Sequence, residues 1–143
     1  MSGMVHALER TARHLAAHGV CVLIQPHRTR RPFIAVVARG RRVPIGGLVN
    51  PVFQPLIDAA NDAIASVVDR GLFKLLNRSN HQFSVRLANP SQLHRYLHNG
   101  QRPPRFPPGA RKRLMAAWRS RPPGAEIEVT EYMTLIGLRR VGA

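Results

Sequence analysis

The first 26 residues constrain the fold of this chain more than any other segment. Residues 4–18 have apolar side chains at helical spacing, Gly19 is a helix stop, and residues 20–25 (Val-Cys-Val-Leu-Ile-Gln) are almost wholly apolar before Pro26. The apolar helix positions are Val5, Leu8, Ala12 and Leu15. A strand that is apolar without alternation is typically covered on both faces. The segment therefore predicts a layered α/β domain, with Ser2 available as the helix cap.

Length and cysteine content bound the class of protein. A chain of 143 residues suits one domain over residues 1–143, and 44% apolar residues is ordinary for a globular protein. No apolar run reaches the ~20 residues of a membrane span, and the N-terminus lacks the basic head and apolar stretch of a signal peptide. Cys21 is the single cysteine, so no internal disulfide can form. We therefore expect a cytoplasmic protein with no membrane partner.

The charge is strongly basic and unevenly distributed. Lysine and arginine total 22 against 7 acids, for a formal charge of +15, and only Lys74 and Lys112 are lysines. A patch built for phosphate would normally mix both residue types, so codon bias in a GC-rich bacterial genome explains the composition equally well. No acid lies between Arg70 and Ala125. Whatever its origin, this charge favours weak binding of polyanions at low salt.

Periodicity predicts four further regular elements after residue 50. The clearest is a helix over 51–69, with Pro51 in its first turn. Strands are expected at 72–76, at 81–87 and at 126–139. In the second of these strands Phe83, Val85 and Leu87 alternate with polar residues, which predicts that they face a core.

Turn residues predict the connections and the shorter elements. A hairpin of 33–38 and 42–45, with a tight turn at Arg39-Gly40-Arg41, lies in a loop-rich insertion over 27–50 that Gly46-Gly47 breaks again. The remaining predicted segments are a helix from Asn89-Pro90-Ser91 to His98, a proline-rich loop over 101–109 and a helix over 110–119.

Two segments carry a family resemblance. The first is Ala7-Leu8-Glu9-Arg10-Thr11-Ala12-Arg13-His14, the turn Leu15-Ala16-Ala17-His18-Gly19 and the strand Val20-Cys21-Val22-Leu23-Ile24. The second is Glu126 to Arg140, which follows Arg121-Pro122-Pro123-Gly124-Ala125. They resemble the last third of a class I S-adenosylmethionine-dependent methyltransferase, where a similar helix leads through Leu-x-Pro-Gly-Gly into the fifth strand and a final antiparallel strand ends the domain. Here one glycine is kept, and Ala17 replaces the proline.

The resemblance implies a fold but supplies no cofactor site. The implied fold is α/β and partial Rossmann-like: a mixed sheet with a parallel-type strand at 20–25, helices on its faces and an antiparallel C-terminal strand. The family holds S-adenosylmethionine with a glycine-rich loop, and no Gly-x-Gly-x-Gly occurs here. No cofactor-binding residue is therefore assigned, and S-adenosylmethionine would bind only if another segment completed the fold.

This resemblance also implies a partner. We expect a methyltransferase-like chain that opens partway through the fold and is inactive alone: a gene fragment, a half completed by another chain, or a remnant with another use. A first strand without its usual neighbours would have an exposed edge. Such an edge favours pairing with a second copy, giving a homo-oligomer, or with a complementing chain.

No catalytic or metal-binding residue is assigned from the sequence. His14 and His18, like His94 and His98, are spaced to face a metal, but neither pair has the further ligands that zinc needs. The acids Asp58 and Asp62 are more simply a solvated helix face, and no serine lies in a nucleophile-elbow pattern.

The alternative function is a basic module that binds nucleic acid. Its candidate residues are Arg105, Arg111, Lys112, Arg113 and Arg119. They are interspersed with Phe106 and Trp118, and arginine beside aromatic rings suits single strands through phosphate contact and stacking. However, Trp118 shares an apolar stripe with Leu114, which predicts that it packs inward.

Overall fold

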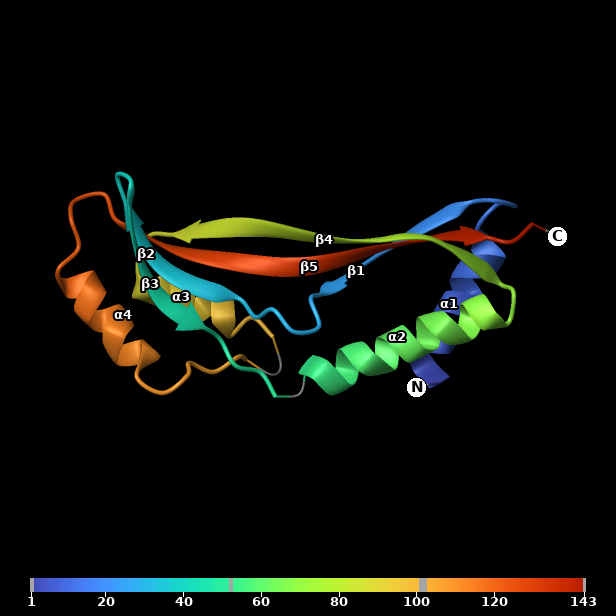
Figure 1. The fold of residues 1–143 in the computed structure, drawn as a ribbon, viewed down its shortest axis with the longest axis horizontal. Coiled ribbons are helices and arrows are strands. Elements are labelled where there is room, and N and C mark those ends of the chain that lie inside the picture. Colours follow the sequence, from blue (N-terminus) through green and yellow to red (C-terminus); the bar gives the residue numbers. More distant parts are fainter. Residues whose placement is uncertain (1, 52, 101–102, 143) are drawn as a thin grey trace. The chain divides into compact units, whose positions relative to one another are not determined.

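A computed structural model describes residues 2–51, 53–100 and 103–142, which form two compact units. Unit 1 comprises 1–29, 52–81 and 133–143, and unit 2 comprises 30–51 and 82–132. The elements in chain order are α1 (Ser2–His14), β1 (Val20–Pro26), β2 (Phe33–Ala38), β3 (Arg41–Gly47), α2 (Phe53–Asp69), β4 (Phe73–Leu87), α3 (Pro90–Leu97), α4 (Ala110–Arg119) and β5 (Glu126–Arg140). Strands β4 and β5 each contribute residues to both units (Figure 1).

The sheet is antiparallel around the C-terminal strand. β5 pairs antiparallel with β1 over Val20↔Arg139 to Pro26↔Met133 and with β2 over Phe33↔Thr130 to Val37↔Glu126. β4 also pairs with β5, and β3 pairs antiparallel with β2. The prediction of an antiparallel final strand is confirmed. The mixed sheet with a parallel-type strand at 20–25 is wrong, because the neighbour of β1 in the described chain is the antiparallel β5.

Unit 1 is a helix layer on one face of three strand segments. α1 and α2 pack side by side (Figure 1). Their buried residues Leu8, Ala12, Ile64 and Val67 form one cluster with Phe73 of β4 and with Ile136 and Leu138 of β5. Cys21 and Leu23 of β1 pack against the same cluster. The opening segment is therefore an integral part of this core.

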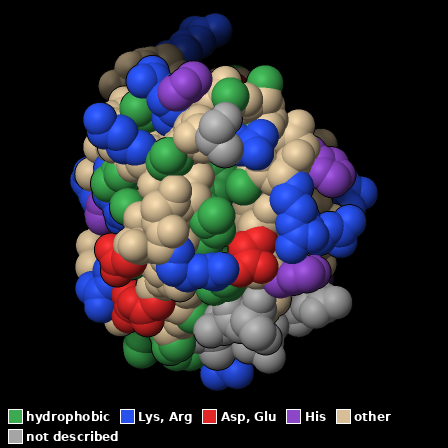
Figure 2. Space-filling view, turned by 90° about the vertical axis from the view of Figure 1, so that its right-hand side faces the viewer, with side chains coloured by type: hydrophobic (Ala, Val, Ile, Leu, Met, Phe, Trp, Pro, Cys, Tyr) green, Lys and Arg blue, Asp and Glu red, His purple; other side chains and the backbone are tan. Residues whose placement is uncertain are grey.

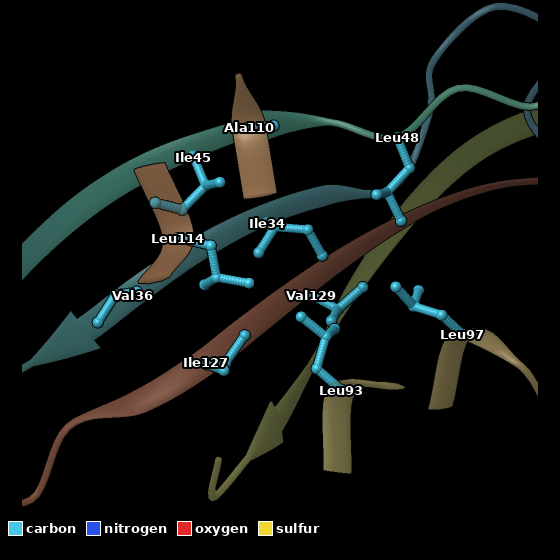
Figure 3. Packing of buried hydrophobic residues seen from close by; sticks show 10 residues of the cluster. All are labelled: Ile34, Val36, Ile45, Leu48, Leu93, Leu97, Ala110, Leu114, Ile127 and Val129. Carbon is cyan, nitrogen blue, oxygen red and sulfur yellow. The ribbon is translucent and has the colours of Figure 1, made fainter. Parts of the chain in front are cut away.

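Unit 2 has a separate core under its own two helices. Figure 3 shows side chains from α3 and α4 meeting side chains from β2, β3 and β5. The cluster contains Ile34, Val36, Ile45, Leu48, Leu93, Leu97, Ala110, Leu114, Ile127 and Val129. Trp118 is half-buried against this cluster, in agreement with its place on the stripe of Leu114. Alternation of Ile127 and Val129 with polar residues thus places one face of β5 toward the helices.

The predictions for the short elements are confirmed. The hairpin β2–β3 turns at Arg39 (φ 37°) and Gly40 (φ 80°), as expected of a two-residue loop that needs positive φ. α3 begins after Asn89, whose side chain accepts from the N–H of Gln92 at 2.9 Å, and Pro90 opens the helix. α4 spans the predicted residues.

Several predictions about β1 and α1 are wrong. β1 is covered on one face only, because α1 and α2 lie on the same side of it. α1 ends at His14 rather than at residue 18, and the left-handed φ before β1, of 61°, belongs to His18 rather than to the predicted stop Gly19. The cap expected at Ser2 depends on a side chain outside the described part of the structure.

Two predicted breaks are absent from β3 and β4. The strands expected at 72–76 and 81–87 are one strand, β4, because polar side chains between them bond across to β5; Thr134 donates to Asn80 at 3.0 Å. Gly46-Gly47 lies inside β3, where the register shifts. Phe83 was expected in a core and is 49% exposed.

The start of α2 and the loop before α4 differ in part from the prediction. α2 begins at Phe53 rather than at 51, so Pro51 precedes it. Of the loop predicted over 101–109, residues 103–109 are described, and Arg105 there pairs with Val49 through backbone hydrogen bonds. No helix among the described residues combines the length and the apolar character that a membrane crossing requires.

Candidate functional site

In the described part of unit 1, the outer edge and one face of β1 lack a neighbouring strand or helix. In the described part of the chain, β1 pairs with β5 and with no second strand. Its side chains alternate: Cys21 and Leu23 face the unit 1 core, whereas Val20, Val22 and Ile24 are 48%, 57% and 65% exposed. These three β-branched residues form an apolar row on the face opposite α1 and α2, hereafter the β1 strip.

The backbone groups of the β1 strip point toward the free edge. The N–H of Arg140 donates to the carbonyl of Gly19 at 2.8 Å, so these two residues form a hydrogen-bonded pair. Hydrogen-bonded and non-hydrogen-bonded pairs alternate along an antiparallel ladder. Val20, Val22 and Ile24 therefore occupy the non-hydrogen-bonded positions opposite β5, and their N–H and C=O groups point away from it.

The edge formed by β4 differs from the edge formed by β1. Among the described strands β4 pairs with β5 alone, and it carries the exposed side chains of Lys74, Arg78 and Arg86 along its length. Charged side chains on an edge strand discourage pairing with another chain. β1 has no charged residue between Val20 and Pro26. Of these two edges, β1 is the one that can accept a further strand.

Polar contacts hold the C-terminal end of β1 and the residues after it to α2. The amide of Gln25 donates to Asn61 at 2.9 Å, and the guanidinium of Arg28 donates to Asp58 at 2.7 Å. The hydrogen bond from Arg28 lowers the pKa of the Asp58 carboxyl, and the same bond raises the pKa of Arg28. These contacts fix the direction of β1 without covering its free edge.

The predicted nucleic-acid residues are divided between structural and solvent-facing positions. Arg113 donates to the carbonyl of Ile45 at 3.0 and 3.2 Å, which joins α4 to β3. The guanidinium of Arg111 lies 5.1 Å from the ring centre of Phe106. Lys112 and Arg119 are exposed and are close together on the helical wheel, on the side opposite Leu114. Arg105 is exposed on the loop before α4.

Arginine side chains cover aromatic rings in unit 2. The pairs, with the distance from guanidinium carbon to ring centre, are Arg30 over Tyr132 (4.3 Å), Arg42 over Phe33 (5.6 Å), Arg111 over Phe106 (5.1 Å) and Arg121 over Trp118 (4.3 Å). Such cation–π contacts stabilise the local surface. A covered ring face is less accessible to a stacking base, so these pairs favour phosphate contact over base stacking.

Most carboxylates of the described chain already have a partner. Glu9 accepts from Arg70 at 2.5 Å, and this bond lowers its pKa. Glu128 lies between Arg42 and Arg86, with both N···O distances 3.1 Å. Glu131 accepts from the hydroxyl of Tyr96 at 2.9 Å. Burial and this hydrogen bond raise the pKa of Tyr96. Glu9 and Glu128 are therefore held in ion pairs and Glu131 in a hydrogen bond, rather than being free for acid–base chemistry.

The described histidines do not form a metal site with other described residues. In the ranges that the structure describes, no group of three or more His, Cys, Asp or Glu side chains could hold a metal ion. The rings of His94 and His98 stack with centres 3.9 Å apart instead of pointing at a common centre. His14 ends α1 and His18 lies beyond it, so the helical spacing expected for this pair does not apply.

Among the described residues, a hollow of about 400 Å³ lies along α1 beside Ala7, Arg10 and His14, and two further hollows also lie outside the β1 strip. One, of about 410 Å³, is in unit 1 between α1, the turn after α2 and the C-terminal end of β5; its charged residues are Glu9, Arg13, Arg70 and Arg140. Arg70 is paired with Glu9, and Arg140 donates to the carbonyl of Leu15. The other, of about 660 Å³, lies beside Trp118 and Arg121 in unit 2. In the unit 1 hollow, Glu9, Arg70 and Arg140 are thus already engaged in contacts within the chain.

The β1 strip is predicted only in part by the sequence. The run Val20 to Ile24 indicated a strand, and the resemblance indicated an exposed edge. Which of its side chains are exposed depends on α1 and α2 lying on the same face of the sheet, and no pattern within β1 indicates this.

Figure 2 shows one face of the molecule, where basic side chains are spread over the surface and the fewer acidic ones lie between them.

Comparisons with protein-family models, with curated protein sequences and with solved structures give no match.

Proposed function

We propose that this chain is methyltransferase-like: the C-terminal part of an S-adenosylmethionine-dependent fold that lacks a cofactor loop of its own. The observation that supports it most is the arrangement of unit 1. There α1 leads through Gly19 into β1, and the final strand β5 lies beside β1 and antiparallel to it. This agrees with the two segments that carry the resemblance, which come from opposite ends of the sequence.

The chain by itself would not transfer a methyl group. S-adenosylmethionine sites of this kind need a glycine-rich loop between a strand and a helix, and no Gly-x-Gly-x-Gly occurs in these residues. The described carboxylates that could act as acid or base are mostly in ion pairs with arginine. A cofactor site would therefore require residues from another segment or another chain.

Calorimetric titration with S-adenosylmethionine tests this proposal. We expect no saturable binding up to about 1 mM ligand, a concentration at which even a weak site becomes occupied. S-adenosylhomocysteine gives the same result if the site is absent. Saturable binding of either ligand would show that the chain contains a cofactor pocket and would contradict the proposal.

The second candidate function is a basic module that binds nucleic acid. Most of the basic residues lie in unit 2, whereas most of the acids lie in unit 1. A surface with this excess of positive charge attracts phosphate backbones and releases their counterions. Lys112 and Arg119 are the best placed of the predicted residues, because both are exposed and lie together on the side of α4 opposite Leu114.

Retardation of a random single-stranded oligonucleotide distinguishes this function from charge alone. Binding that persists at physiological salt and weakens in the double variant Lys112→Gln and Arg119→Gln would support it. The matched control is Arg10→Gln with Arg13→Gln, which removes the same charge from exposed positions on α1 of unit 1. Equal weakening in both variants, or binding lost at modest salt, would leave only unspecific attraction.

A further inference from the structure

We propose that a second copy of this chain pairs with β1, edge to edge and antiparallel, through the β1 strip. The resulting dimer would have one continuous sheet across the two copies of unit 1. This inference goes beyond the proposed function, because it depends on the geometry of β1 and needs no cofactor.

The register of β1 allows a symmetric pair. The outward N–H and C=O groups belong to Val20, Val22 and Ile24, which are evenly spaced about Val22. With the two-fold axis beside Val22, that residue pairs with its own copy and Val20 pairs with Ile24 of the other copy. In an antiparallel sheet each such pair exchanges two N–H···O=C bonds. A symmetric contact of this kind closes at two copies.

The side chains favour the same arrangement. All three residues of the β1 strip project on one face, so in the pair they would form a continuous row of valine and isoleucine side chains from both copies. These residues are 48–65% exposed in the single chain, and β-branched neighbours on adjacent strands pack well against each other. α1 and α2 cover the opposite face and leave this row open.

The charges near β1 permit the contact. Arg139, opposite Val20 on β5, is an exposed charged residue on the open face. From strand spacings of about 4.8 Å and rises of about 3.4 Å per residue, the two copies of Arg139 would lie about 20 Å apart. That exceeds the ~8 Å screening length at physiological salt. The formal charge of +15 on each chain still opposes association, so added salt should strengthen the pair.

The size of the contact sets its expected strength. The paired edge is short, and a strand contact without further burial falls below the ~1,200 Å² of a tight interface. We therefore expect a dimer that forms at micromolar to millimolar concentration and dissociates on dilution. A partner strand from a different chain is the other occupant of this edge, and it would leave this chain monomeric by itself.

Sedimentation velocity from about 1 µM to about 1 mM tests the pairing across this range of affinity. Wild type should shift from monomer to dimer, and more completely at about 0.5 M salt, where the screening length falls to roughly 4 Å. Val22→Lys places a charge on the edge and should remain monomeric. Val22→Pro removes an N–H that points away from β5, so it should abolish the dimer while keeping the fold.

Controls separate this inference from general stickiness and from misfolding. Leu56→Lys changes an apolar residue of α2 with 47% exposure and should dimerise like wild type. Circular dichroism should show native content in every variant. A wild type that is monomeric throughout, or a dimer that survives Val22→Pro, would overturn the pairing. S-adenosylmethionine binding would contradict the proposed function and leave the pairing intact.

Discussion

Arg113 is a structural residue, because its guanidinium joins α4 to the carbonyl of Ile45 in β3. From the sequence alone, Arg113 cannot be distinguished from Lys112, since both are bases on one predicted helix. Their difference arises from position on the helical wheel: Arg113 borders the buried stripe, and Lys112 faces solvent. The partner of Arg113 is a backbone atom 68 residues away, which spacing within α4 could not reveal.

Arg113→Gln should therefore destabilise the protein by about 1–2 kcal/mol, because a hydrogen-bonded carbonyl loses a charged donor. Lys112→Gln, one residue earlier, should change the free energy of unfolding by less than about 0.5 kcal/mol. Urea denaturation of both variants measures the difference. Equal effects would contradict the structural role of Arg113.

Glu9 gives a pH dependence with a definite sign. The hydrogen bond from Arg70 lowers the folded-state pKa of Glu9 below its ordinary value, so its contribution is present at neutral pH and is lost as pH falls through the folded pKa. Glu9→Gln should lose less stability than wild type between about pH 6 and about pH 3. Thermal unfolding across this range checks it, and parallel curves for the two proteins would contradict it.

The sequence predicts helices and turns that have strong local signals, such as caps and periodic apolar residues. It does not predict strand boundaries that depend on contacts with residues far away in the sequence. α3, α4 and the β2–β3 hairpin follow from Asn89, Leu114 and Gly40 through capping, periodicity and turn geometry. β4 is one strand where the sequence predicts two, because Asn77 to His81 suggest a polar loop; in the sheet, Asn80 instead accepts a hydrogen bond from Thr134 of β5. That bond is made across 54 residues.

The hairpin turn offers a stabilising substitution. Arg39 has a φ of 37°, which is unfavourable for a long side chain, and Gly40 follows at 80°. Arg39→Asn would create Asn-Gly, the sequence most suited to this turn, and should raise the free energy of unfolding by about 0.5–1 kcal/mol. Arg41→Asn, just outside the turn, is the control and should give no gain. Denaturation midpoints measure both.

The arrangement of the whole sheet follows from long-range pairing around β5. The sequence predicted that the final strand is antiparallel and that the opening helix and strand belong to the fold. It did not predict that β5 would pair with β1, β2 and β4, nor that β1 would have one open face. The apolar run Val20–Ile24 is compatible with burial on both faces, and only the position of α1 and α2 on one side decides the outcome.

The pairing of the first strand with the last carries both the proposed function and the proposed dimer. Nuclear Overhauser spectroscopy on labelled protein measures it directly. In non-hydrogen-bonded antiparallel pairs the Cα atoms are about 4.5 Å apart, so their α-protons give strong cross-peaks. We predict such cross-peaks between Val20 and Arg139, Val22 and Gly137, and Ile24 and Leu135. Their absence, or cross-peaks that place another strand beside β5 at these positions, would contradict the account.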